Sequence, residues 1–216
     1  MKNPVKERPI IFSSPMIRAI LEGRKTQTRR LVKDINPTLL AKGLGPGHIE
    51  EIIRRCPHGK PGDKLWCRES FSHYGNQHEN GTDYALVQYR ADNLCADIDL
   101  SMWWDDQSPL PTEKWWNKFP EHKFKPSIFM PLWASRITLE IKNVRVERVQ
   151  DISEEEAVAE GVYKNDHGNF QDYEAKPEMA WFGSARESFA TLWRSINGPG
   201  AWERNDWVWV IKFKVV

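Results

Sequence analysis

The chain has 216 residues, 40% of them hydrophobic, and is long enough to bury a sizeable core. Its 31 basic and 30 acidic residues give a formal net charge of +1, which argues against a strongly basic protein that coats nucleic acid and makes any anion-binding site a local one. No apolar run approaches the roughly 20 residues of a membrane span, and the apolar part of the N-terminus is too short for a signal peptide.

The N-terminal part predicts a strand, a helix and a second strand. Residues 8–13 (RPIIFS) have the apolar content of a short buried strand. Ser14 then offers an N-cap hydroxyl, Pro15 suits the first helical position, and Gly23 is a natural end for the helix. We expect residues 26–32 (TQTRRLV) to continue as a strand.

Between that helix and strand lies GRKTQTRR (23–30), in which four cationic side chains are interleaved with two threonines. As part of a turn, these cations would complement the negative end of the helix dipole. Alternatively, a partly buried Lys25 could act as a general base toward Thr28. Residues three apart on a regular strand face opposite sides, so the two converge only if residues 23–26 still belong to the turn.

The three cysteines, Cys56, Cys67 and Cys95, are an odd and scattered set. This argues against a disulfide framework and predicts a reducing, cytoplasmic compartment. Cys56, His58 and Cys67 fit no common zinc spacing. We therefore expect unpaired thiols, with no metal and no cofactor.

The middle of the chain alternates between short elements and irregular segments. A short helix is expected near residues 48–54, a turn and strand at 60–71, and another strand at 84–92. Residues 93–126 are rich in tryptophan and have no clear periodicity. We interpret about 73–130 as an insertion into a smaller core, since loops of this length are more often functional or mobile than idle.

The clearest strand is 135–150, in which the alternation of apolar residues breaks at Lys142-Asn143, as a bulge or tight bend would require. The chain closes on a second clear strand, WVWVIKFKVV. Five large apolar side chains alternate along its predicted inner face: Trp207, Trp209, Ile211, Phe213 and Val215.

Two helices are expected between these strands, and each begins with a capping box, Ser153 with Glu156 and Ser184 with Glu187. About five strands with short helices between them predict an α+β fold, a mixed barrel or open barrel. We expect residues 1–216 to form a single domain.

Four features, taken in order, resemble the ASCH domain family, a relative of the PUA fold. Gly23, Lys25, Thr28 and Arg30 match the family's G-x-K-x-x-T-x-R pattern. The others are the Gly-Asp turn in PGDKLW, the long strand leading to ISEEEAVAEG, and the closing strand VWVIKFK. The resemblance covers about half the chain, and SIFMPLWASRI and SINGPGAWERNDWVWVIKF are similar to ASCH proteins of bacteriophages and prophages.

The resemblance implies a PUA-like β-barrel with short flanking helices, a cleft suited to nucleic acid or a nucleoside, and a place in the cytoplasm of a bacterial host. Some small bacterial ASCH proteins are amidohydrolases that remove the acetyl group from N4-acetylcytidine with a lysine, a threonine and a glutamate. By motif, these are Lys25 and Thr28, with Glu160 as the glutamate and Glu156 as the alternative register.

In the implied chemistry, Thr28 attacks the amide carbonyl, Lys25 takes its proton, and Glu160 orients the lysine or protonates the leaving amine. Arg29 and Arg30 would stabilise the oxyanion or bind a phosphate. The doubled arginine favours a phosphate over a free nucleoside.

Four more residues are candidates for binding the base. Trp66 and Trp133 could stack on it, although each could equally be a core residue. Glu69 and Arg136 could read a base edge, or could pair with each other.

Three hypotheses follow for the function. The first is an amidohydrolase acting on an N4-acylated cytosine nucleoside or a related modified base. The second is a binding module for RNA or modified nucleic acid without turnover, and the third is a ribonuclease. The sequence leaves the choice among them open, because one fold hosts many functions, and it leaves the oligomeric state open as well.

Overall fold

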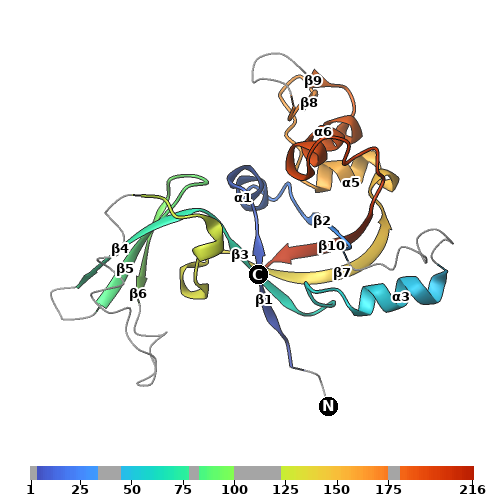
Figure 1. Cartoon of the computed structure of the whole chain (residues 1–216). Coiled ribbons are helices and arrows are strands. Elements are labelled where there is room, and N and C mark those ends of the chain that lie inside the picture. Colours follow the sequence, from blue (N-terminus) through green and yellow to red (C-terminus); the bar gives the residue numbers. More distant parts are fainter. Residues whose placement is uncertain (1–3, 34–44, 78–82, 100–122, 175–180) are drawn as a thin grey trace. The chain divides into compact units, whose positions relative to one another are not determined.

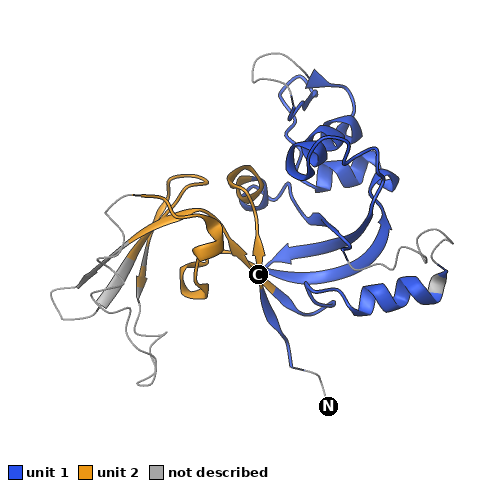
Figure 2. Ribbon diagram, viewed as in Figure 1, with its two compact units in different colours: residues 1–8, 19–64, 139–216 blue, residues 9–18, 65–138 orange. Residues whose placement is uncertain are grey.

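A computed structural model describes residues 4–33, 45–77, 83–99, 123–174 and 181–216 of the chain. The chain divides into two compact units, drawn in different colours in Figure 2. Unit 1 comprises Met1–Arg8, Ala19–Lys64 and Leu139–Val216, and unit 2 comprises Pro9–Arg18 and Leu65–Thr138. The segment that we interpret as an insertion falls within unit 2.

The largest sheet has five strands in the order β1-β3-β7-β10-β2 (Figure 1). The C-terminal strand β10 is central to unit 1, because it pairs antiparallel with both β7 and β2. The strands span Glu7–Ile11 (β1), Gln27–Leu31 (β2), Lys64–Arg68 (β3), Thr138–Arg148 (β7) and Trp207–Val215 (β10).

The predicted break in the long strand is confirmed. Lys212 of β10 pairs with Asn143 of β7, but the next residue, Phe213, pairs with Ile141, so the register shifts by one residue at Lys142. This bulge lets the apolar residues on both sides of it stay on the buried face of β7.

Four α-helices lie in the described residues, and the predicted helix starts are confirmed at both capping serines. The hydroxyl of Ser153 accepts from the Glu156 N–H, and that of Ser184 from the Glu187 N–H, each at 3.2 Å. The helices span Ser14–Leu21 (α1), Pro46–Arg54 (α3), Glu154–Ala159 (α5) and Ala185–Asn197 (α6), with short 3-10 turns at Ser127–Phe129, Leu132–Ala134 and Val149–Asp151.

The first half of β10 is buried on both faces, where the sequence pattern predicted one. Trp209, Ile211 and Phe213 are buried as expected, whereas Trp207 is half-buried and Val215 is exposed; on the other face, Val208 and Val210 are buried as well. The two valines belong to the core of unit 1, together with residues of α5, α6 and the small hairpin of β8 (Phe170–Gln171) and β9 (Trp181–Phe182). The helices over this face cover Val208 and Val210, whereas Lys212 and Lys214 further along the same face are exposed.

Unit 2 contains an antiparallel three-stranded sheet in the order β4-β5-β6. The strands are β4 (Phe71–Gln77), β5 (Asp83–Tyr89) and β6 (Cys95–Asp99). The expectation of irregular structure after residue 93 is therefore wrong for β6, whose short polar sequence gives little strand signal by itself. The core of this unit gathers Phe71, Val87, Tyr89, Met130 and Ala134. The tryptophan pairs at 103–104 and 115–116 lie outside the described residues.

The described part of the chain thus has a mixed α+β fold, as expected, with open sheets and four α-helices. None of the described helices has the length and apolar character needed to cross a membrane.

Candidate functional site

The segment that carries Lys25 is a turn, and β2 begins only at Gln27. Gly23 adopts φ 73°, a left-handed conformation that suits glycine at the end of α1. The Lys25 N–H then donates to the Ala19 carbonyl, and the Thr26 N–H to the Ala159 carbonyl at the end of α5, both at 2.9 Å. Residues 24–26 are therefore irregular and do not belong to β2, and the convergence of Lys25 with Thr28 stays a prediction.

Lys25 is buried and paired with Glu160. Its side-chain amine donates to the Glu160 Oε2 at 3.0 Å and to the Glu160 main-chain carbonyl at 2.7 Å. Lys25 is 2% exposed and Glu160 4% exposed. The two residues that the resemblance selected, 135 positions apart in the chain, are thus in direct contact.

The surroundings lower the pKa of the Lys25 amine. Burial lowers the pKa of this lysine from its usual 10.5, the Glu160 carboxylate works against that shift, and the positive charges of Arg30 and Arg29 add to it. A lowered pKa makes a larger fraction of this amine neutral than in an exposed lysine, and the neutral amine is the form that can accept a proton.

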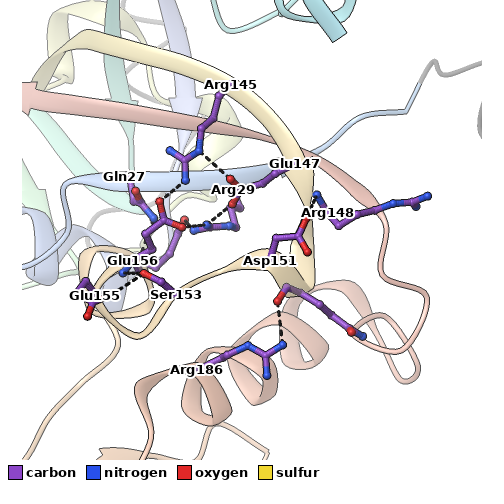
Figure 3. Close-up of polar contacts among 12 residues, drawn as sticks. Gln27, Arg29, Arg145, Glu147, Arg148, Asp151, Ser153, Glu155, Glu156 and Arg186 are labelled. Atoms are coloured by element: carbon purple, nitrogen blue, oxygen red, sulfur yellow. Dashed lines mark hydrogen bonds and ion pairs between the residues drawn. The ribbon is translucent and has the colours of Figure 1, made fainter. Parts of the chain in front are cut away.

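Arg29 lies among carboxylates (Figure 3). Its Nη1 donates to Glu160 Oε1 at 3.0 Å, and its Nη2 donates to Glu147 Oε1 at 2.5 Å and Glu156 Oε2 at 2.7 Å. The side chain is 0% exposed. In this arrangement the guanidinium donates its hydrogen bonds to Glu160 and the two neighbouring carboxylates. The contact of Arg29 with a phosphate or an oxyanion, which the resemblance implies, stays a prediction.

The structure separates the two candidate glutamates. Glu160 is the one that Lys25 contacts, at the C-terminal end of α5. Glu156 contacts Arg29 and also Arg145, and its main-chain carbonyl accepts from the Gln27 side chain at 3.1 Å. The pKa of the Glu156 carboxyl is lowered: burial opposes this, but the two arginines outweigh burial.

Thr28 and Arg30 occupy alternate positions of β2 from Arg29. Thr28 is 3% exposed and pairs with Ile211 of β10, whereas Arg29 pairs with Val210. Directly opposed residues share a face, so Thr28 and half-buried Arg30 lie on the face of the sheet opposite to Arg29. The contact between Thr28 and Lys25 stays a prediction.

The other four candidates belong to unit 2. Arg136 donates two hydrogen bonds to the carboxylate of buried Glu69, at 2.9 and 3.1 Å. The alternative that these two residues pair with each other is therefore confirmed. Trp66 is buried, with the Arg68 guanidinium 4.6 Å from its ring centre. Trp133 is half-buried and packs against the core of unit 2.

Several partners in these clusters carried no sequence signal. Arg145 and Glu147 alternate correctly to share one face of β7, but only the strand order brings that face to Arg29. Asp92 binds the Nη1 of Arg136 at 2.7 Å, and the Tyr89 ring lies 4.0 Å from that guanidinium. Tyr89 ends β5 and Asp92 lies in the turn after it, so both are more than 40 residues from Arg136 in the chain, and no local pattern predicts the contact.

The three cysteines form no disulfide: Cys56 and Cys67 are buried and Cys95 is exposed. Within the described ranges, no group of three or more His, Cys, Asp or Glu side chains could hold a metal ion.

Comparison with known proteins adds no relative. No protein-family model, no curated protein and no solved structure matches this chain.

Proposed function

We propose that the chain is an ASCH-type amidohydrolase that cleaves the N4-acyl amide of a modified cytidine or a related nucleoside. The observation that carries the proposal is the buried contact between Lys25 and Glu160. A motif resemblance selected these two residues from distant parts of the sequence, and the fold brings their side chains together. Burial of a lysine needs a compensating partner, and a base-orienting carboxylate is one that the proposed chemistry would use.

The order of elements along the chain also supports the proposal. Helix α1, the segment with Lys25, β2, the long strand β7, α5 and the closing strand β10 follow one another in the order that the resemblance predicts. We take the sheet that contains β7, β10 and β2 as the counterpart of the PUA-like barrel, with residues 73–130 as the insertion.

The proposed reaction has two stages. The Thr28 hydroxyl attacks the amide carbonyl while neutral Lys25 takes the hydroxyl proton, and the tetrahedral intermediate then expels the amine, which receives that proton from Lys25. The acyl group remains on the Thr28 oxygen as an ester. Water, deprotonated by Lys25, hydrolyses the ester and releases the carboxylic acid and the free hydroxyl. The net change is one amide and one water converted to amine and acid.

The first test follows the ultraviolet change as N4-acetylcytidine becomes cytidine. We expect turnover by the wild type and a loss of at least about 100-fold in Thr28→Val and in Lys25→Ala, since nucleophile and base are both required. Lys212→Ala is the matched control, because Lys212 is an exposed lysine of the same sheet and should leave turnover unchanged.

The outcomes separate the hypotheses. Loss in Lys25→Ala but not in Thr28→Val would remove Thr28 as the nucleophile and leave water as the attacking group. A folded wild type without turnover on acetylated nucleoside or acetylated RNA would contradict the proposal. Binding of such RNA without turnover would then favour the binding module, and cleavage of bulk RNA the ribonuclease.

A further inference from the structure

The carboxylate of Glu160 is held on both oxygens by N–H donors, one from Lys25 and one from Arg29. Its Oε2 accepts from the Lys25 amine and its Oε1 from the Arg29 guanidinium, both at 3.0 Å. All three side chains are almost completely buried. Charge-assisted bonds of this kind are the strongest hydrogen bonds a protein makes, and a buried carboxylate held on both oxygens cannot rotate.

We propose that Arg29 is a positioning residue, which holds the Glu160 carboxylate in place against the amine of Lys25. The proposal rests on the function proposed above and assigns Arg29 a part in it that neither the motif nor the family resemblance predicts. Arg29 acts through Glu160, so it does not itself touch the substrate.

Hydrogen-bond chemistry also decides between the two roles considered for Glu160. A protonated carboxyl would have to direct its O–H at Arg29, which accepts no hydrogen bond, or at the lone pair of neutral Lys25, which the proposed reaction needs for the Thr28 proton. With N–H donors on both oxygens, we assign Glu160 the role of a carboxylate that orients Lys25. The proton for the leaving amine therefore comes from Lys25, which received it from the nucleophile.

Arg29 is in turn held in place by a second group of charged side chains. Glu147 and Glu156 both accept from its Nη2, and Arg145 binds the other oxygen of each of these two carboxylates (Figure 3). This cluster brings together β2, β7 and α5. Among the described residues, Arg145 thus shares Glu147 and Glu156 with Arg29 but forms no ion pair with Glu160, which makes it a matched comparison.

The charges that face Lys25 give the expected direction of effect. They are the Glu160 carboxylate from the end of α5, and Arg29 and Arg30 from β2. Burial lowers the pKa of Lys25, Glu160 raises it, and the two arginines lower it. Removal of the Arg29 charge removes one of the charges that lower the pKa of Lys25, while Glu160 still raises it. Lys25 should therefore keep its proton to higher pH.

The experiment titrates Lys25 directly by nuclear magnetic resonance of isotope-labelled lysine side chains in the full chain. A Lys25→Arg variant assigns the signal. We expect the pKa of Lys25 to rise by about one unit in Arg29→Met and by clearly less in Arg145→Met. In parallel, the rising limb of the pH–rate profile on N4-acetylcytidine should move to higher pH by the same amount as the titration in Arg29→Met.

An unchanged titration in Arg29→Met, or equal shifts in Arg29→Met and Arg145→Met, would overturn the proposal, because the effect would then be absent or would reflect only the total charge of the cluster. If Arg29→Met does not fold, Glu160→Gln decides: the pKa of Lys25 must fall, and a constant or raised value refutes the coupling. The titration needs no turnover. If the pKa of Lys25 shifts as expected in a protein that shows no turnover, the proposed hydrolase activity is contradicted. The role of Arg29 toward Glu160 is then still supported.

Discussion

Gly161 shows at the scale of one residue how tightly the Lys25 site is built. It follows Glu160 directly and adopts φ +86°, where L side chains are strained. A Cβ at this position would lie 2.8 Å from the Cβ of Lys25 and 3.0 Å from that of Ala19. The turn after α5 can therefore pass beside Lys25 only because residue 161 has no side chain.

Gly161→Ala should accordingly displace Lys25 as well as strain the backbone. We expect a loss of at least about 2 kcal/mol in the free energy of unfolding, from the left-handed conformation and the overpacking together, and a lower kcat in the nucleoside assay. Urea denaturation and the ultraviolet assay measure the two effects.

Gly168→Ala is the control for this change. Gly168 has the same φ of +86°, but the nearest atom to its added Cβ is the Lys164 Cε at 3.8 Å. It should lose only the backbone contribution of about 1 kcal/mol and keep full turnover. Equal losses in the two variants would show that contact with Lys25 does not matter at residue 161.

At the scale of elements, α5 and α6 are joined by a shared cap. The Glu154 carboxylate in the first turn of α5 accepts from the Ser184 hydroxyl at 2.5 Å and from the Ala185 N–H at 2.7 Å. These groups form the N-terminus of α6, where a negative charge meets the positive end of the helix dipole. One acidic side chain therefore connects the helix that positions Glu160 to the longest helix of the core.

Glu154→Gln should lower the free energy of unfolding by about 1 kcal/mol, because the neutral amide gives a weaker cap to α6. Chemical denaturation at neutral pH, with and without 1 M salt, tests this, since salt should reduce the difference between variant and wild type. Glu155→Gln is the comparison: the Glu155 carboxylate accepts from the Ser153 hydroxyl at the N-terminus of its own helix. A smaller effect of Glu154→Gln than of Glu155→Gln would contradict the shared cap.

For the whole molecule, the two units each have a hydrophobic cluster of their own. Phe189 and Trp193 of α6 are buried in unit 1, and Phe71 and Tyr89 of β4 and β5 in unit 2. The chain passes between the units within β1, α1, β3 and β7, whose residues are divided between them. The sequence predicts that residues 1–216 form one domain. If they do, the two units should unfold together in one cooperative transition.

Phe71→Ala probes that cooperativity. Phe71 is 1% exposed, and we expect the truncation to destabilise the unit 2 core by about 3–5 kcal/mol. Hydrogen exchange read by mass spectrometry should show faster exchange in β4 and β5, with smaller changes in α6. An equal increase in both places would instead show a single cooperative domain.

Local physics determined much of the secondary structure in advance. Ser153, Ser184 and Gly23 act on neighbours within four residues, so the ends of α1, α5 and α6 could be predicted from the chain alone. The alternation in 135–150 and its break at Lys142 are also local, and the structure confirms them. The same reasoning missed β6, whose strand depends on pairing with β5 and not on its own composition.

The candidate site, too, was predicted in part from the sequence and decided in part by the tertiary structure. The sequence by itself determined the residues, because a short motif at Lys25 and Thr28 and a helix ending at Glu160 could be matched to a family pattern. Only the tertiary structure decided that Lys25 meets Glu160, that Arg29 is enclosed by carboxylates, and that Glu69 is paired with Arg136. The physical reason is range: caps and alternation act over a few residues, whereas each of these charges finds its partner through the order of strands and helices in the fold.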